Sequence, residues 1–416
     1  MTNSVSVLDI VVSMDDDTTP QHGGRALVVG LGIAGIATAL RLREIGWDPV
    51  IVERAPSRRA GGYFIMLFTT GVASARRLGV LDTIGDRTPS PLVNHEVNRA
   101  GRRRPGMSPA GLPGRPRQLL RGDIEQALFA ALPSDVEIRY STVPTRITQD
   151  PAAAEVTLHD TSTGASDTER FDLVVGADGM RSAVRELAFG GGYLSPLGYV
   201  IGATVLDGPV DGFCQDEGLT LAEPGRSATV FPFRDHPPSL LFSYRTRDLD
   251  AEFRRRPIES IRAAFGPRPP GPLLEHLFTR FEQAPERLFD SVNQVKMPSW
   301  HHGRVVLIGD AAWCVTLYAG MGASSGIAGA ELLGTMLRLH PGDLPAALGA
   351  WEARMRPFIA TEQDSALFMR KIFTPHDRRE RLARAVMLRT PALARAMGKI
   401  MGGPDMSNKE LDVAAA

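Results

Sequence analysis

The sequence predicts an α/β fold in which a parallel sheet is interrupted by a mainly antiparallel sheet and followed by helices. Three apolar runs, 25–29, 173–175 and 305–308, are each followed by glycine-containing motifs, as expected of buried strands that end at the same edge of one sheet. Between residues 190 and 300, short alternating apolar runs separated by Gly, Pro and Asp indicate antiparallel strands. The 416 residues suffice for two or three domains with stable cores.

The first unit, residues 25–54, is predicted to be β-α-β. Gly30-x-Gly32-x-x-Gly35 follows an apolar run, and Glu53 ends the next apolar run. Such glycines permit a tight turn close to a pyrophosphate, the following helix directs its first amides at that anion, and the acid accepts the ribose hydroxyls. The spacing therefore predicts a Rossmann-like dinucleotide-binding unit. The alternative is an ordinary strand-turn-helix whose glycines only tighten the loop.

The elements up to the second buried strand follow from local patterns. A helix is predicted over Leu119–Leu132, because its leucines and isoleucine recur every four residues on one face. Ala100-Gly101 indicates a hairpin over His95–Arg104. The other expected elements are a run over Tyr63–Leu67, an amphipathic segment over Val72–Leu81, and a strand meander over Val136–Tyr140, Thr145–Thr148 and Glu155–Leu158.

The middle and the end of the chain differ in period. Strands are expected over Tyr199–Val205, Ala228–Phe233 and Leu240–Tyr244. From Leu344 to Phe358 the apolar residues recur at four, three, four and three residues, which predicts a helix with a kink at Pro357.

Composition excludes several classes of function. Lys plus Arg equals Asp plus Glu, 47 each, so there is no basic surface for nucleic acid or an anionic membrane. Two cysteines fit a reducing cytoplasm and exclude a disulfide framework. The uncharged run Ala311–Ala330 is long enough to span a bilayer, but its four glycines and the preceding Asp310 favour a buried loop and helix start. Adjacent His301 and His302 would point to opposite faces of a strand, so no metal site is predicted.

Three motifs at strand ends give a specific resemblance. They are the glycine loop with Glu53-Arg54, the stretch Gly176–Ser182, and Gly309–Ala312 followed by Gly320-Met321-Gly322. In this order, over residues 25–340, the chain resembles the single-component FAD-dependent monooxygenases with the para-hydroxybenzoate hydroxylase fold. Arg121-Gly122-Asp123, among other stretches, resembles an actinobacterial natural-product branch of that family.

The resemblance implies FAD as the cofactor, with NADH or NADPH as a transient co-substrate that has no domain of its own. Asp310 would accept hydrogen bonds from the ribityl chain, Arg121 would contact the ribityl or phosphate part, and Asp178 would lie where the flavin and nicotinamide are positioned. Helix capping is the alternative role for Asp178 and Asp310. The expected cofactor-binding residues are Gly30, Gly32, Ile33, Ala34, Gly35, Glu53, Arg54, Arg121, Asp178, Gly309, Asp310, Gly320, Gly322 and Ala323.

The expected domain organisation is discontinuous. Residues 1–24 are predicted to be a disordered leader, and residues 341–416 C-terminal helices. The FAD-binding domain is expected to comprise 25–92, 116–188 and 300–340, and the substrate domain 93–115 and 189–299. The residues expected to line an apolar substrate pocket are Phe231, Phe233, Phe242, Tyr244 and Leu317; ordinary sheet core is the alternative for the aromatic ones.

The implied reaction transfers oxygen, through a C4a-hydroperoxyflavin, to a hydrophobic polyketide or aromatic natural-product intermediate. The flavin does this chemistry, so no catalytic side chain is assigned. Trp313, Leu317 and Ser324 depart from the family pattern at positions expected to line the reactive face of the flavin. They leave open a redox-neutral cyclase, of the 4+2 cycloaddition type, that keeps FAD as a structural cofactor. A flavin-bearing binding module is the third alternative, and the oligomeric state is not predicted.

Overall fold

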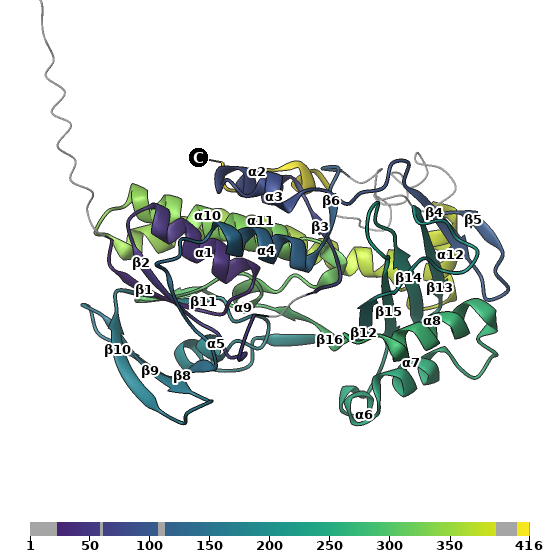
Figure 1. Cartoon of the computed structure of the whole chain (residues 1–416), viewed down its shortest axis with the longest axis horizontal. Coiled ribbons are helices and arrows are strands. Elements are labelled where there is room, and N and C mark those ends of the chain that lie inside the picture. Colours follow the sequence, from purple (N-terminus) through teal and green to yellow (C-terminus); the bar gives the residue numbers. More distant parts are fainter. Residues whose placement is uncertain (1–22, 59–60, 107–112, 388–405, 416) are drawn as a thin grey trace, which may run out of the picture.

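The computed structural model describes residues 23–58, 61–106, 113–387 and 406–415 (Figure 1). The leader expected over 1–24 lies outside these residues, apart from Gly23 and Gly24. Residues 388–405, which belong to the expected C-terminal helices, also lie outside them.

A six-stranded sheet forms the centre of one end of the molecule. Its order is β17 (His301–His302), β18 (Val305–Leu307), β11 (Leu173–Gly176), β1 (Arg25–Val29), β2 (Asp48–Val52) and β7 (Glu137–Arg139), all parallel except β17. Val29 pairs with Gly176, and Gly176 with Leu307. The three predicted buried strands therefore end at one edge, which brings their motif loops together.

Helices cover one face of this sheet and a small sheet covers the other (Figure 1). The helices are α1 (Ile33–Glu44), α4 (Arg121–Ala131), α10 (Gly322–Leu339) and α11 (Leu344–Phe373). The small sheet is antiparallel and consists of β8 (Thr142–Gln149), β9 (Ala154–Asp160) and β10 (Ser166–Phe171), with α5 (Ala183–Phe189) beside it. Both faces of the central strands are thus buried, as their continuous apolar runs require.

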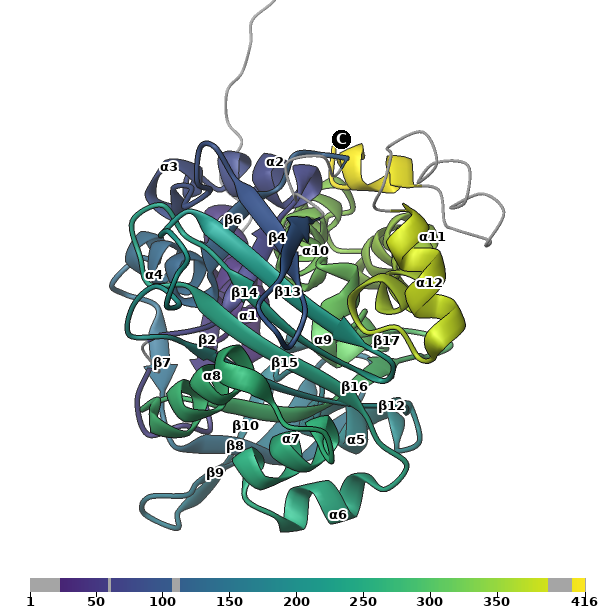
Figure 2. The ribbon, with the colours of Figure 1, turned by 90° about the vertical axis from the view of Figure 1, so that its right-hand side faces the viewer.

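A seven-stranded sheet forms the other end of the molecule, which Figure 2 shows facing the viewer. Its order is β16 (Leu288–Val295), β12 (Leu194–Val205), β15 (Ser239–Arg245), β14 (Arg226–Phe231), β13 (Glu217–Glu223), β4 (Val93–Val97) and β5 (Arg103–Pro105). Only the β13–β4 pair is parallel. Helices α6 (Leu249–Arg254), α7 (Pro257–Phe265) and α8 (Gly271–Gln283) lie beside it in Figure 1.

Short elements connect the two sheets. The two-stranded antiparallel ribbon of β3 (Phe64–Leu67) and β6 (Arg117–Leu120) runs between them. Along the chain, β3 is followed by α2 (Thr69–Arg77) and α3 (Leu81–Ile84), and β6 is followed by α4. The remaining elements are α9 (Asp310–Trp313), the 3-10 turn η2 (Leu317–Ala319), α12 (Arg378–Met387) and the 3-10 turn η3 (Met406–Glu410).

The structure confirms the predicted fold class and corrects several elements. The predicted meander is wrong at its first strand, because β7 pairs in parallel with β2. Leu119 and Leu120 belong to β6, so the helix begins two residues later than predicted. The sequence reading missed α6–α8, and α11 continues through Pro357 to Phe373. No helix in the described part of the chain is long and apolar enough to cross a membrane.

Candidate functional site

The glycine loop brings α1 against β1 and β11. Gly30 has a φ of +107°, and a Cβ there would lie 2.6 Å from the carbonyl oxygen of Ala177. A Cβ at Gly35 would lie 1.9 Å from the carbonyl oxygen of Gly30. Gly32 differs, because the atom nearest to its Cβ position is Nη2 of Arg121 at 3.7 Å. Gly30 and Gly35 are therefore required by packing, whereas Gly32 leaves room for a ligand at the start of α1.

Glu53 stands at the end of β2, beside this loop. Its Oε2 accepts the backbone N–H of Leu31 and its Oε1 accepts that of Ala55, both at 2.9 Å. A carboxylate oxygen has two lone pairs, so each oxygen can still accept a ribose hydroxyl. The structure thus adds a second role for Glu53, which is to fix the glycine loop.

Two neighbouring cavities run along this edge of the sheet. The smaller, of 270 Å³, is lined by the glycine loop, Glu53 and Arg58, and the larger, of 460 Å³, extends to the seven-stranded sheet. Residues from the first two motif regions and α4 line both cavities: Gly32, Arg54, Arg121, Ala177, Asp178, Gly179 and Arg181. Their shared walls form an elongated site whose shape suits a dinucleotide with a substrate beyond it.

The third motif forms part of the wall of the larger cavity, with Gly309, Asp310, Gly320, Gly322 and Ala323. The 18-residue helix α10 begins at Gly322, so the positive end of its dipole and its unpaired amides lie at this wall. The side chain of Asp310 opens into the cavity, and burial by the surrounding protein raises the pKa of its carboxyl while Arg121 opposes the rise. This arrangement can bind an anionic ring edge and accept hydroxyl donors.

Asp178 is engaged differently from Asp310. Its Oδ2 accepts the backbone N–H of Ala183 at 2.6 Å and that of Val184 at 3.2 Å, and its Oδ1 accepts the hydroxyl of Ser182 at 2.5 Å. The helix-capping interpretation therefore describes Asp178, which also lines both cavities. Burial raises the pKa of its carboxyl, and the hydrogen bonds from Ser182 and the backbone oppose this.

The far end of the larger cavity is apolar and aromatic. Phe64 from β3 stacks on Phe231 from β14, with ring centroids 3.9 Å apart and an interplanar angle of 6°. The apolar residues that complete this end are Ile65, Met66, Ile201, Ala203, Leu241, Leu288, Leu317 and Phe373. Asp290 also lines the larger cavity and accepts hydrogen bonds from Arg181 of the shared wall at 2.5 and 3.0 Å, so the two neutralise each other. The sequence reading missed Phe64, whose stack depends on pairing remote in sequence.

Phe233, Phe242 and Tyr244 were wrongly predicted to line the substrate pocket. Phe242 packs against phenylalanines of α7 and α8, and the Tyr244 hydroxyl donates to Glu252 on α6 at 2.9 Å. Phe231 pairs with Ser239, and Leu241 is two residues further along the same strand, so Phe231 and Leu241 lie on the same face of the sheet. Phe242 pairs with Ala228 and lies on the opposite face. The register therefore places Phe242 and Tyr244 on the helix-covered face of the sheet. Phe233 lies beyond the end of β14 and is fully buried outside the cavity lining.

Of the three departures from the family pattern, only Leu317 lines the cavity. Trp313 packs in a buried cluster with Trp300 and Trp351, at centroid distances of 4.8 and 5.8 Å. Ser324 is buried and its hydroxyl accepts the backbone N–H of Phe68 at 2.9 Å. The expectation that Trp313 and Ser324 line the reactive face is therefore wrong, because both side chains fill the protein interior.

Two further residues of this wall escaped the sequence reading. Thr316 adopts a φ of +75°, a strained value for a β-branched residue, immediately before Leu317. Tyr318 lines the cavity, and its hydroxyl lies 2.7 Å from that of Ser243. Burial raises the pKa of Tyr318 to about 12. Neither residue belongs to a motif, so no local signal could have found them.

The described residues contain no group of three or more His, Cys, Asp or Glu side chains that could hold a metal ion. They do fit FAD. Gly32 would leave room for the pyrophosphate, and Glu53 and Asp310 would supply acceptors for the sugar and ribityl hydroxyls, since α1 and α10 direct their N-termini at the cavities.

The chain is similar to known flavoproteins over most of its length. Residues 25–340 match the family model described as FAD binding domain. A flavin-dependent monooxygenase from Legionella longbeachae is 25% identical over 361 residues, covering 85% of this chain and 90% of the relative. The FAD-dependent monooxygenase asL4 from Sarocladium schorii is 24% identical over 389 residues, covering 82% of this chain and 85% of the relative.

Solved structures share the fold. The crystal structure of tetracycline destructase Tet(51) superposes with a TM-score of 0.74 at 24% identity, covering 94% of this chain and 97% of that chain. Klebsiella pneumoniae HpxO, complexed with FAD and uric acid, superposes with a TM-score of 0.69 at 21% identity, covering 94% and 96%. The chain therefore belongs to the FAD binding domain family, with FAD as its cofactor, among the flavin-dependent monooxygenases with the para-hydroxybenzoate hydroxylase fold.

Proposed function

We propose that this protein is an FAD-dependent monooxygenase that places one oxygen atom on an uncharged, hydrophobic polyketide or aromatic intermediate of natural-product biosynthesis. NADH or NADPH would be the reductant. The observation that supports this most is that one cavity contains both the Asp310 and α10 wall and the Phe64–Phe231 stack. A ring held on that stack would share its cavity with the flavin. The names of the Legionella longbeachae and Sarocladium schorii relatives agree with this reaction class.

The residues of this chain would bind, orient and exclude water. Bound FAD supplies the electron transfer and oxygen activation. Glu53 would hold the adenosine ribose and Asp310 the ribityl hydroxyls, while the positive end of α10 would stabilise negative charge on the adjacent ring. Because Arg181 neutralises Asp290 in the larger cavity, an uncharged substrate is favoured. No side chain is assigned as a general acid or base.

The experiment follows reduction and oxygen transfer separately. NADH or NADPH is added anaerobically, with and without candidate polyketides and aromatics, while flavin absorbance is recorded. Labelled oxygen is then admitted, and the molecular mass of the product is measured. We expect flavin bleaching and one labelled oxygen atom in the product.

The redox-neutral cyclase remains the second candidate, and it now depends on Leu317 alone, since Trp313 and Ser324 do not reach the cavity. A product isomeric with its substrate, formed without nicotinamide or oxygen, would establish the cyclase. Substrate binding with neither flavin reduction nor product would instead indicate a binding module.

A further inference from the structure

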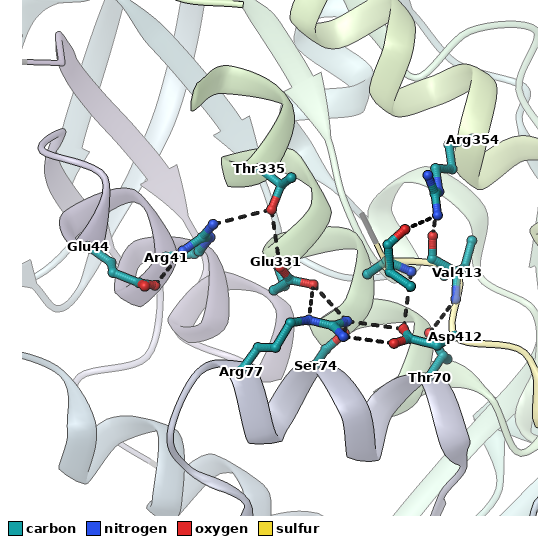
Figure 3. Close-up of polar contacts among 12 residues, drawn as sticks. Arg41, Glu44, Thr70, Ser74, Arg77, Glu331, Thr335, Arg354, Asp412 and Val413 are labelled. Atoms are coloured by element: carbon teal, nitrogen blue, oxygen red, sulfur yellow. Dashed lines mark hydrogen bonds and ion pairs between the residues drawn. The ribbon is translucent and has the colours of Figure 1, made fainter. Parts of the chain in front are cut away.

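The C-terminal segment 406–415 is docked on the FAD-binding half of the molecule. Figure 3 shows Arg77 of α2 donating to Asp412, at 2.7 Å, and the backbone N–H of Val413 donating to Thr70, at 3.2 Å. Arg354 of α11 donates to the carbonyl oxygen of Val413 at 2.8 Å. Val413 belongs to the main hydrophobic core. The segment is thus an integral part of the packing around α2 and α11.

Lys409 is the buried cation of this segment, with 2% of its surface exposed. Its Nζ donates to the carbonyl oxygen of Ala319 at 2.7 Å, pairs with Glu362 of α11 at 2.5 Å, and lies 4.8 Å from the centre of the Phe68 ring. The other carboxylate oxygen of Glu362 accepts the side-chain amide of Asn408 at 3.0 Å. Both oxygens of Glu362 therefore receive hydrogen bonds from the C-terminal segment.

Ala319 ends the turn that forms part of the cavity wall. Its neighbours Leu317, Tyr318 and Gly320 line the larger cavity, whereas Lys409 does not. Gly320 has a φ of +68° and donates its N–H to Leu317 at 3.0 Å, and α10 begins two residues later. Lys409 thus contacts the buried side of a turn whose other side faces the cavity.

Stability alone does not account for a lysine at this position. Removing Lys and Glu from water is costly, and apolar residues of similar volume commonly stabilise a protein equally well or better. A charge-assisted hydrogen bond, by contrast, fixes the direction and position of its acceptor. Lys409 therefore contributes a defined location for the Ala319 carbonyl that an apolar side chain would not provide.

We propose that Lys409 is a positioning residue for the wall of the larger cavity, where it holds the turn over residues 317–320 and the start of α10 in the conformation that receives FAD. The proposal rests on FAD binding by this family. It is independent of the substrate and of oxygen transfer.

The test compares two variants of the full chain. Lys409→Met with Glu362→Gln removes the ion pair and the bond to Ala319 without leaving a buried charge unpaired. Asp412→Asn, the matched control, weakens the Arg77 contact of the same segment and leaves the turn untouched. The FAD dissociation constant, the melting temperature, and hydrogen exchange of peptides covering 317–322 are measured for both variants and the wild type.

We expect the double variant to bind FAD about tenfold or more weakly and to exchange faster at 317–322, while Asp412→Asn binds FAD within about twofold of wild type. Unchanged FAD affinity and exchange in the double variant would overturn the proposal. Losses of affinity that simply follow melting temperature in both variants would also overturn it, since the segment would then be a general stabiliser. Failure of the wild type to bind FAD would remove its premise, a result visible before any variant is compared.

Discussion

Leu31 donates its backbone N–H to the carboxylate of Glu53 at 2.9 Å, so the glycine loop is fixed by the same residue that we expect to hold the adenosine ribose. The partner oxygen of Glu53 accepts the N–H of Ala55 at 2.9 Å. The two acceptor oxygens of this carboxylate are therefore already fixed in position before a ligand binds. Little conformational entropy is then lost when the ligand binds to them.

Replacement of Glu53 should weaken FAD binding in two ways. Glu53→Ala removes a charged acceptor for the ribose and releases Leu31 and Ala55, a loss of about 1.5–3 kcal/mol in binding free energy. Glu53→Gln keeps one acceptor oxygen and should fall between the alanine variant and wild type. Fluorescence titration of FAD into the apoproteins measures both. If folded Glu53→Ala binds FAD within about twofold of wild type, Glu53 does not contact the ribose.

Gly35→Ala tests the close approach of α1 to β1. The new Cβ would lie 1.9 Å from the carbonyl oxygen of Gly30, which belongs to the backbone and can move only with the loop. We expect a loss of about 2 kcal/mol or more in unfolding free energy, together with loss of bound FAD. Gly349→Ala on α11 is the control, because no atom lies within 4 Å of its Cβ position and a helix favours alanine. Equal stability of the two variants would show that α1 can shift away from the Gly30 carbonyl without a loss of unfolding free energy.

Local sequence predicts the cofactor end of the site better than the substrate end. The glycine loop, Glu53 and the strand-ending motifs are signals within a few residues, and parallel strands necessarily bring their ends to one edge. Alternation shows that Phe242 and Tyr244 share a face, but the identity of that face depends on where α7 and α8 pack. That packing is set by contacts remote in sequence.

Two other residues show the same limit. Trp313 follows Asp310 by three residues, yet it packs with Trp300 and Trp351 because the local turn directs it into the core. Lys409 contacts Ala319, 90 residues away, and nothing in its neighbourhood distinguishes it from an exposed lysine.

Phe231 and Phe242 should separate substrate binding from stability. Phe231→Ala removes apolar surface from the cavity, so KM for the substrate should rise. Loss of its stack on Phe64 should also lower the unfolding free energy by about 0.5–1.5 kcal/mol beyond the effect of the buried area. Phe242→Ala empties a site in the core beneath α7 and α8 and should cost about 3–5 kcal/mol of unfolding free energy, with KM unchanged in the folded protein. Denaturant unfolding and steady-state kinetics test both. The reverse pattern would show that the register assigns the wrong face to the cavity.

Tyr318 should remain neutral throughout the physiological pH range, although the residue lines the cavity. Burial raises the pKa of its hydroxyl from 10.0 to about 12, and the hydrogen bond with Ser243 only partly opposes the rise. Because the folded pKa lies above the unfolded one, the stabilisation is complete below pH 10 and is lost as the pH rises through about 12. The near-ultraviolet difference between wild type and Tyr318→Phe, recorded against pH, should therefore show no phenolate until well above pH 10. An ionisation midpoint at or below 10 would mean that water reaches the hydroxyl. Even then Tyr318 would stay protonated at neutral pH, so in either case it can only donate or accept a hydrogen bond at the cavity wall.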